Sequence, residues 1–140
     1  MPAPDNAVRV AGEWVEKAEH DLDAATHLLT LGEDGPTDVA CFHAQQCVEK
    51  YLKALLVLHG RPVPRTHDVA KIVALAAIGH PIDITPDEMH TLTEYATEAR
   101  YPGSAPVSLE EAEEAVLLAG RVREQVRRLF PPEALVRRRK

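Results

Sequence analysis

Residues 37–59 read TDVACFHAQQCVEKYLKALLVLH, a segment that is apolar around most of a helical circumference. Apolar side chains recur here every three or four positions, which is the period of an α-helix. The main stripe consists of Ala40, Ala44, Cys47, Tyr51, Leu55 and Leu58. A helix that is apolar on so many sides must contact more than one neighbour. We therefore expect this segment to be the central helix, ended by Gly60 and Pro62.

Four further segments carry helical signals. Residues 8–31 repeat apolar positions at helical spacing, and residues 68–78 do so over a shorter length. Residues 85–88 and 108–111 are capping boxes, each of which opens another helix. No segment reads as a strand, so the sequence predicts an all-α fold, an antiparallel up-and-down bundle of four main helices plus one short helix. Because the central helix is apolar over more of its circumference than one such core can cover, we also expect a homodimer.

Charge is distributed unevenly along the chain. Its 140 residues fit one domain, with an expected core at about 8–130 and a basic C-terminal tail at 131–140. Residues 121–140 hold eight basic and two acidic side chains, so this end carries +6 while the other 120 residues carry −12. A basic end on an acidic body can bind phosphate or an acidic partner. The alternative is a solubilising tail whose charges favour a helix C-terminus.

Several function classes are disfavoured by what the sequence lacks. No apolar run approaches the roughly 20 residues of a membrane span, and the first residues do not resemble a signal peptide, so we expect a cytoplasmic protein without membrane contact. Cys41 and Cys47 face different sides of one helix, too far apart for a disulfide, and are interpreted as buried free thiols. The seven histidines include no i,i+4 pair on a helical face, so we expect no metal and no cofactor.

The loop at 61–67 is the first candidate for chemistry. Arg61 and Arg65 can hold a phosphate, and His67 can donate or accept a proton near neutral pH. Backbone N–H groups from Thr66 onward, where the short helix opens, could also face an anion. The alternative is that Thr66 or His67 caps the short helix while both arginines are solvated.

Arg100 and Tyr101 are the second candidate, before a loop rich in Pro, Gly and Ser. An Arg–Tyr pair at a cleft can hold phosphate and stack on a base. It can equally be a cation at a helix C-terminus beside a packed tyrosine. His43 lies among apolar residues in the central helix, and we interpret it as a satisfied core or interface histidine rather than a catalytic one.

Several of these stretches, in this order, resemble HEPN domains of the prokaryotic type. The central helix contains CFHAQQCVEKYLKALL at 41–56, followed by Thr-His-Asp-Val at 66–69 and Ala-Arg-Tyr-Pro at 99–102. The opening helix also fits, so the resemblance covers roughly residues 10–130. It implies a homodimeric bundle of four main helices plus a shorter one. Such domains are often paired with a minimal nucleotidyltransferase, as toxin and antitoxin or as a two-subunit enzyme.

The resemblance also implies a possible activity, because some HEPN members are metal-independent RNases with an active site at the dimer interface. Their signature is an Arg and a polar residue followed, four to six residues after the Arg, by a His. Here no histidine follows Arg100 in residues 101–140, and the only such spacing runs from Arg61 to His67.

Three functional hypotheses follow. The first is a HEPN subunit that binds nucleotide or RNA phosphate and partners a minimal nucleotidyltransferase. The second is a metal-independent RNase, in which Arg61 or Arg100 stabilises the phosphorane and His67 exchanges the proton of the 2′-OH. The third is a non-catalytic dimeric scaffold. For the first two, we expect one cleft at a pole of the bundle, completed by the dimer mate and lined by Arg61, Arg65, His67, Arg100 and Tyr101.

Overall fold

The computed structural model describes residues 5–99 and 101–135, and within these residues all regular structure is helical. The helices are α1 (Asp5–Leu29), η1 (Gly32–Asp34), α2 (Thr37–Leu58), α3 (Val69–Ala76), α4 (Pro86–Thr97), α5 (Leu109–Arg127) and η2 (Pro132–Ala134), where η marks a 3₁₀ helix. The predicted all-α class is confirmed. Each of the five predicted helices is present within a few residues of its expected bounds.

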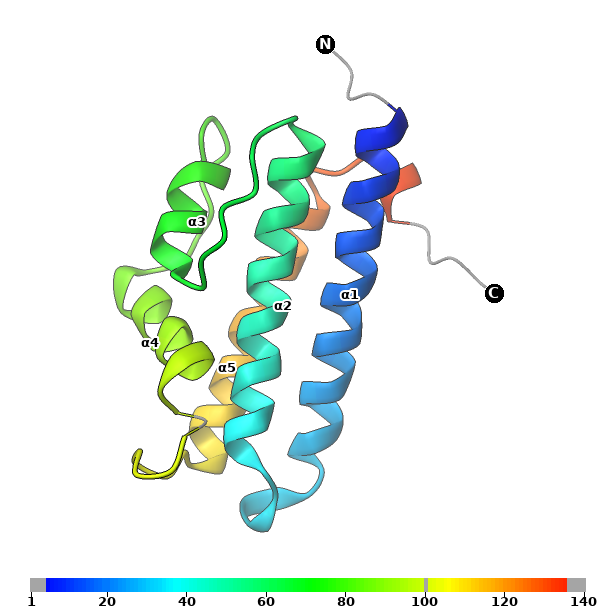
Figure 1. Ribbon diagram of the computed structural model, residues 1–140. Helices are drawn as coiled ribbons and strands as arrows, with labels where there is room; N and C mark the ends of the chain where they lie inside the picture. Colours follow the sequence, from blue (N-terminus) through cyan, green and yellow to red (C-terminus); the bar gives the residue numbers. More distant parts are fainter. Residues whose placement is uncertain (1–4, 100, 136–140) are drawn as a thin grey trace.

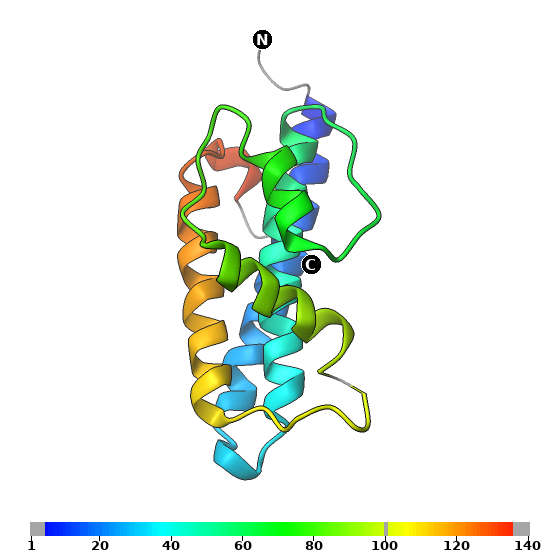
Figure 2. The same cartoon turned by 90° about the vertical axis from the view of Figure 1, so that its left-hand side faces the viewer.

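Three long helices form the body of the bundle. α1 and α2 run antiparallel side by side, and α5 lies behind them in Figure 1. α3 and α4 cover another side of α2, and Figure 2 shows α4 crossing the long helices obliquely. α2 contacts all four other α-helices. The prediction that this segment is the central helix is therefore confirmed.

The two predicted capping boxes begin α4 and α5. Thr85 and Ser108 each accept a hydrogen bond from the backbone N–H three residues later, and the Glu at that position bonds back to the cap. Such a box satisfies N–H groups that the first turn of a helix leaves without a partner. These local signals therefore fix where both helices begin.

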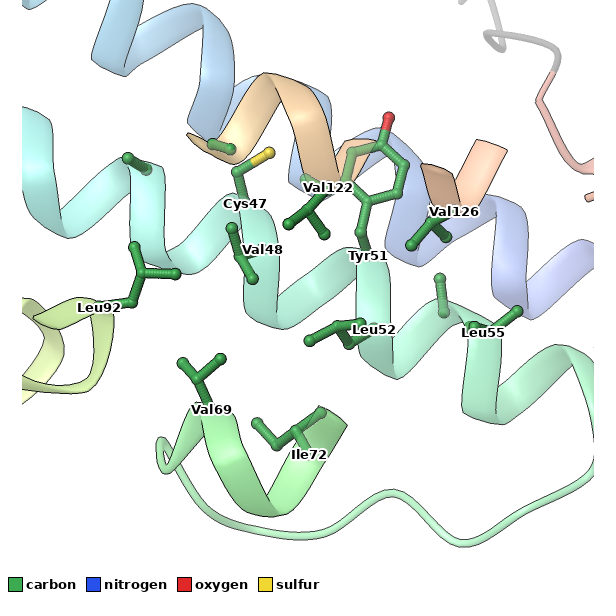
Figure 3. Packing of buried hydrophobic residues seen from close by; sticks show 14 of the residues in the cluster. Cys47, Val48, Tyr51, Leu52, Leu55, Val69, Ile72, Leu92, Val122 and Val126 are labelled. Atoms are coloured by element: carbon green, nitrogen blue, oxygen red, sulfur yellow. The ribbon is translucent and has the colours of Figure 1, made fainter. Parts of the chain in front are cut away.

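The core is built from side chains of every α-helix around α2. In Figure 3, Leu52 points toward Val69 and Ile72 of α3, while Tyr51 lies beside Val122 of α5. All five side chains are fully buried. Truncating a leucine in such a position to alanine typically costs about 2–5 kcal/mol of stability, so this packing holds the fold together.

The coverage of α2 changes the case for a dimer. Every apolar residue of α2 is buried or half-buried within the single chain. The reason we gave for a homodimer is therefore wrong, because α1, α3, α4 and α5 together cover the apolar circumference. The homodimer itself stays a prediction. Among the described residues, the large apolar side chains that remain exposed lie elsewhere, at Leu31, Leu75, Ile78, Tyr101 and Leu117.

The last described residues pack against α1. Phe130 and Ala134 are buried. A Cβ added at Gly12 would lie 3.0 Å from the carbonyl oxygen of Ala134, so a glycine there permits the close approach of η2. Residues 131–135 fall within the predicted tail but belong to the packed fold, whereas 136–140 lie outside the described residues. No described helix has the length and apolarity that crossing a membrane requires.

Both cysteines are buried and unpaired with each other, as predicted. Burial raises the pKa of Cys41 to about 12 and that of Cys47 further above its usual value. Because the thiolate is the reactive form of cysteine, neither side chain is suited to nucleophilic chemistry near neutral pH.

Candidate functional site

A buried carboxylate on α2 positions His67. Lys53 Nζ donates to Glu49 Oε2 at 2.9 Å, one turn away along the helix. His67, at the end of the loop that follows α2, places its Nδ1 2.8 Å from Glu49 Oε1. The side chain of Glu49 is 5% exposed and that of His67 is 58% exposed. The carboxylate is therefore hidden from solvent while the imidazole reaches it.

The surroundings of Glu49 fix its charge and the tautomer of its neighbour. Burial raises the pKa of Glu49, but hydrogen bonds from Lys53, Gln45 and His67 and the charge of Lys53 together lower it below its usual 4.5. An ionised carboxylate can only accept hydrogen bonds, so Nδ1 of His67 carries the proton. In the neutral ring, Nε2 then has a free lone pair, which is the arrangement of a general base.

Asp68 begins α3 and leaves His67 available to Glu49. Its side chain accepts from the backbone N–H of Lys71 at 3.4 Å, and its own N–H donates to Thr66 Oγ1 at 3.1 Å. The alternative in which Thr66 or His67 caps the short helix is therefore wrong. The N–H of Val69 donates to Thr93 Oγ1 at 3.0 Å. These N–H groups are used within the fold, so they do not face an anion.

The two arginines of the loop differ in their surroundings. Arg61 Nη1 donates to the carbonyl oxygen of Leu75 at 3.1 Å, near the end of α3. His67 precedes the start of α3, and six residues of helix rise about 9 Å, so Arg61 and His67 do not converge within one chain. Arg65 is exposed and makes no hydrogen bond or ion pair within the part of the chain that the structure describes.

The second sequence candidate lies elsewhere in the bundle. Arg100 is outside the described residues. Tyr101 is 62% exposed and lines a hollow of about 450 Å³ with Thr37 and Asp38, at the start of α2. Glu49, which holds His67, is twelve residues further along α2 than Thr37, or about 18 Å by helical rise. Within one chain, Tyr101 and His67 therefore do not share the single cleft we expected.

A second carboxylate–histidine pair joins α1 to α2. Asp21 of α1 accepts from His43 Nδ1 at 2.7 Å and from Lys50 Nζ at 2.6 Å. The side chains of Asp21, His43 and Lys50 are 10%, 30% and 26% exposed. His43 is thus a satisfied histidine, as interpreted, but it lies at the edge of the α1–α2 interface with part of its ring in solvent.

A third, partly exposed polar cluster joins α1, α2 and α5. Glu19 of α1 accepts two hydrogen bonds from the Arg123 guanidinium, at 2.7 and 2.8 Å, and one from the Tyr51 hydroxyl at 2.6 Å. Burial raises the pKa of Glu19, but these hydrogen bonds and nearby positive charge lower it below its usual value. Arg121 pairs with Glu88 at 2.6 Å. Two arginines of the basic C-terminal end are therefore used to hold helices together.

Sequence reasoning missed Glu49, Lys53 and Asp21 as parts of these clusters. In the sequence they are charged side chains at helical spacing among apolar ones. That pattern indicates a solvent-exposed side of a helix rather than a site. Among the described residues, no three His, Cys, Asp or Glu side chains are grouped so that they could hold a metal ion. The clusters around Asp21 and Glu49 instead contain one imidazole, one carboxylate and one ammonium each.

Comparison with known proteins identifies the class to which this helical bundle belongs. The HEPN domain family matches residues 11–129. The chain therefore belongs to the HEPN domain family.

Two solved structures share the fold. TT1696 from Thermus thermophilus is 32% identical and superposes with a TM-score of 0.69, covering 86% of this chain and 98% of that one. ST0689, an archaeal HEPN homologue, is 27% identical with a TM-score of 0.65 and the same coverage of 86% and 98%.

A curated relative matches a shorter stretch. The chain is 42% identical over 53 residues to the protein named "Putative toxin MJ1304" of Methanocaldococcus jannaschii. The match covers 38% of this chain and 33% of that protein, so the chain spans about a third of the length of this relative.

Proposed function

We propose that this chain is a HEPN subunit that binds nucleotide or RNA phosphate around His67 and works with a minimal nucleotidyltransferase. The pair of Glu49 and His67 carries the proposal, because a hidden carboxylate holds an exposed imidazole in one orientation. Arg65, two residues before His67, supplies a cation that is not used within the described fold. The toxin name of the archaeal relative supports a toxin–antitoxin-like pairing.

The homodimer is part of this proposal. Arg61 and Tyr101 join His67 only if a second copy of the chain brings them to it, and we place Arg100, which lies outside the described residues, in the same shared site. We therefore expect a dimer in sedimentation experiments at micromolar concentration, and a monomer there would contradict this part. A complex with a minimal nucleotidyltransferase encoded beside this gene is expected as well. Failure of the two purified proteins to associate would contradict the pairing.

A metal-independent endoribonuclease is the second candidate, favoured by the same carboxylate–histidine pair. In this reaction, His67 Nε2 takes the proton of the 2′-OH while O2′ bonds to phosphorus. The P–O5′ bond breaks, and the leaving oxygen takes a proton from water, giving a 2′,3′-cyclic phosphate and a 5′-OH. Glu49 stabilises the imidazolium that forms, and an arginine stabilises the charge on the phosphorane.

The test uses a substitution that keeps the contact with Glu49. In His67→Asn, the side-chain amide N–H can take the place of Nδ1–H, while the outward nitrogen is lost. The matched control is His90→Asn, because His90 is an exposed histidine on α4 that pairs with Glu94 at 2.9 Å. We expect His67→Asn to weaken binding of labelled single-stranded RNA at least about tenfold, or about 1.4 kcal/mol, and His90→Asn to leave it unchanged.

Incubation of the same proteins with RNA in EDTA separates the candidates. Cleavage by the wild type that disappears in His67→Asn selects the endoribonuclease. RNA binding that depends on His67 without cleavage selects the binding subunit. If RNA neither binds nor is cut, both candidates fail and the non-catalytic scaffold remains.

A further inference from the structure

A hollow of about 420 Å³ lies between α1 and the side of α2 that carries Lys50, and what it binds extends the proposed function. Its lining consists of Glu13, Trp14, Glu16 and Lys17 of α1 and Lys50 of α2. Lys50 directly follows Glu49, the residue that holds His67. Because successive residues of an α-helix are rotated by about 100°, the hollow and the imidazole lie on two sides of the same turn of α2. Its volume is within the range of small-ligand sites.

Two of the four charged groups around the hollow are already paired. Glu13 accepts from Arg9 at 2.8 Å, in an exposed ion pair. Lys50 donates to Asp21 at 2.6 Å. These contacts leave the rim without a strong excess of either charge. A bare phosphate requires an excess of positive charge, and a simple cation requires an excess of negative charge, so neither suits this rim.

The remaining side chains supply an acceptor, a donor and an aromatic surface. Glu16 and Lys17 make no hydrogen bond or ion pair within residues 5–99 and 101–135. Trp14 is half-buried and packs against the core, and it also lines the hollow. The lining of the hollow thus combines part of an indole surface with an unused carboxylate and an unused ammonium.

We propose that this hollow takes a nucleobase of the bound RNA, with guanine preferred. A base has a flat face that stacks on tryptophan and an edge that carries both donors and acceptors. Guanine places two N–H donors side by side, which one carboxylate such as Glu16 accepts together. Its O6 and N7 are acceptors, to which an ammonium such as Lys17 donates.

The proposal rests on RNA binding at His67 and defines how the strand runs. A strand that crosses the exposed side of α2 places one base in the hollow and a neighbouring phosphate at His67, because both lie at the same turn of a helix that is about 10–12 Å across. Lys50 lines the hollow, and its side chain is 26% exposed. It contacts the backbone of the strand as it passes.

Trp14 gives a direct readout, because it is the only tryptophan in the chain. We expect guanosine 5′-monophosphate to quench its fluorescence saturably, and cytidine 5′-monophosphate to bind about tenfold more weakly. Titration of free tryptophan amide corrects for light absorbed by the bases. Glu16→Gln loses the bidentate acceptor and is expected to weaken guanosine binding about tenfold. The matched control is Glu113→Gln, an exposed carboxylate on α5, which leaves binding unchanged.

The outcomes separate this inference from the proposed function. Absence of saturable quenching by any mononucleotide overturns the base site, as does equal guanosine affinity in Glu16→Gln and the wild type. RNA binding that depends on His67 without these effects keeps the phosphate site alone. If quenching is saturable and depends on Glu16, but His67→Asn leaves RNA binding unchanged, the base site stands. The phosphate site at His67 is then wrong.

Discussion

The two carboxylate–histidine pairs of α2 have the same chemistry and different settings. In each, a hidden carboxylate accepts from the Nδ1 of a histidine and from a lysine. His43 stands on α2 itself and reaches across to Asp21 of α1, and its side chain is 30% exposed. His67 stands on a loop, and its side chain is 58% exposed. A carboxylate–histidine pair alone therefore does not indicate a reactive site. The element that carries the ring and its exposure decide what the ring can reach.

The largest expected difference between the pairs is in stability. Glu49→Ala leaves Lys53, whose side chain is 9% exposed, as a buried ammonium without its partner, which should cost about 3 kcal/mol. Asp21→Ala should cost less, about 1–2 kcal/mol, because Lys50 and His43 can turn to solvent. Urea unfolding of both variants measures this order. If Asp21→Ala is the more destabilised, His43 rather than His67 belongs to the more constrained pair.

A second test concerns pH. The pKa of Glu49 is lowered in the folded state, so its contribution is fully present above the unfolded value of about 4.5 and is lost as pH falls through the folded pKa. Wild type should therefore exceed Glu49→Gln by about 2 kcal/mol near neutral pH, and the difference should shrink on acidification. Glu19 is unchanged in both proteins and cancels. A difference that is constant with pH would show that Glu49 is not held as a carboxylate.

The third test compares the two rings directly. His67→Asn should lower RNA affinity at least about tenfold, whereas His43→Asn should change it less than about twofold, since both keep an N–H for their carboxylates. Thermal midpoints within a few degrees of wild type would show that neither substitution acts through the fold. If both substitutions lowered RNA affinity equally, the greater exposure of His67 would not explain why it, rather than His43, binds RNA.

The smallest effect is expected from the end of the chain. Residues 137–140 carry four positive charges and lie outside the described residues. Their removal should weaken RNA binding only a few-fold, because point charges attract phosphate without reading bases. The slope of affinity against salt should fall by about 0.7 for each RNA phosphate that the shortened chain no longer neutralises. An unchanged slope in a salt titration would assign the tail to solubility.

Most of the fold follows from local signals, and most of the site does not. The helical period of α2 and the capping boxes at Thr85 and Ser108 are encoded within a few residues of one another, so they can be read without tertiary knowledge. The path of the loop at 61–67 is not local. It runs back along α2 from the end of that helix to Glu49, and nothing in its own residues specifies this direction.

The Arg61–His67 spacing illustrates the same limit. A spacing of six residues corresponds to a rise of about 9 Å on a helix, but in an extended segment it can span up to about 20 Å. Pro62 and Pro64 favour extended backbone in the residues before them, and the loop is not helical. The reasoning about a dimer failed for a related reason, because a helical wheel shows how apolar α2 is without showing how many helices cover it.

The two buried thiols provide a measure of local motion. Cys41 hydrogen-bonds with Tyr95 of α4, whereas Cys47 lies near charged groups of α1 and α5. Since neither thiol reacts while it is buried, a thiol reagent modifies each only when its own interface opens. Faster labelling of Cys41 than of Cys47 under native conditions would mean that α4 detaches as a separate unit. Equal rates that follow global unfolding would mean that the five helices open together.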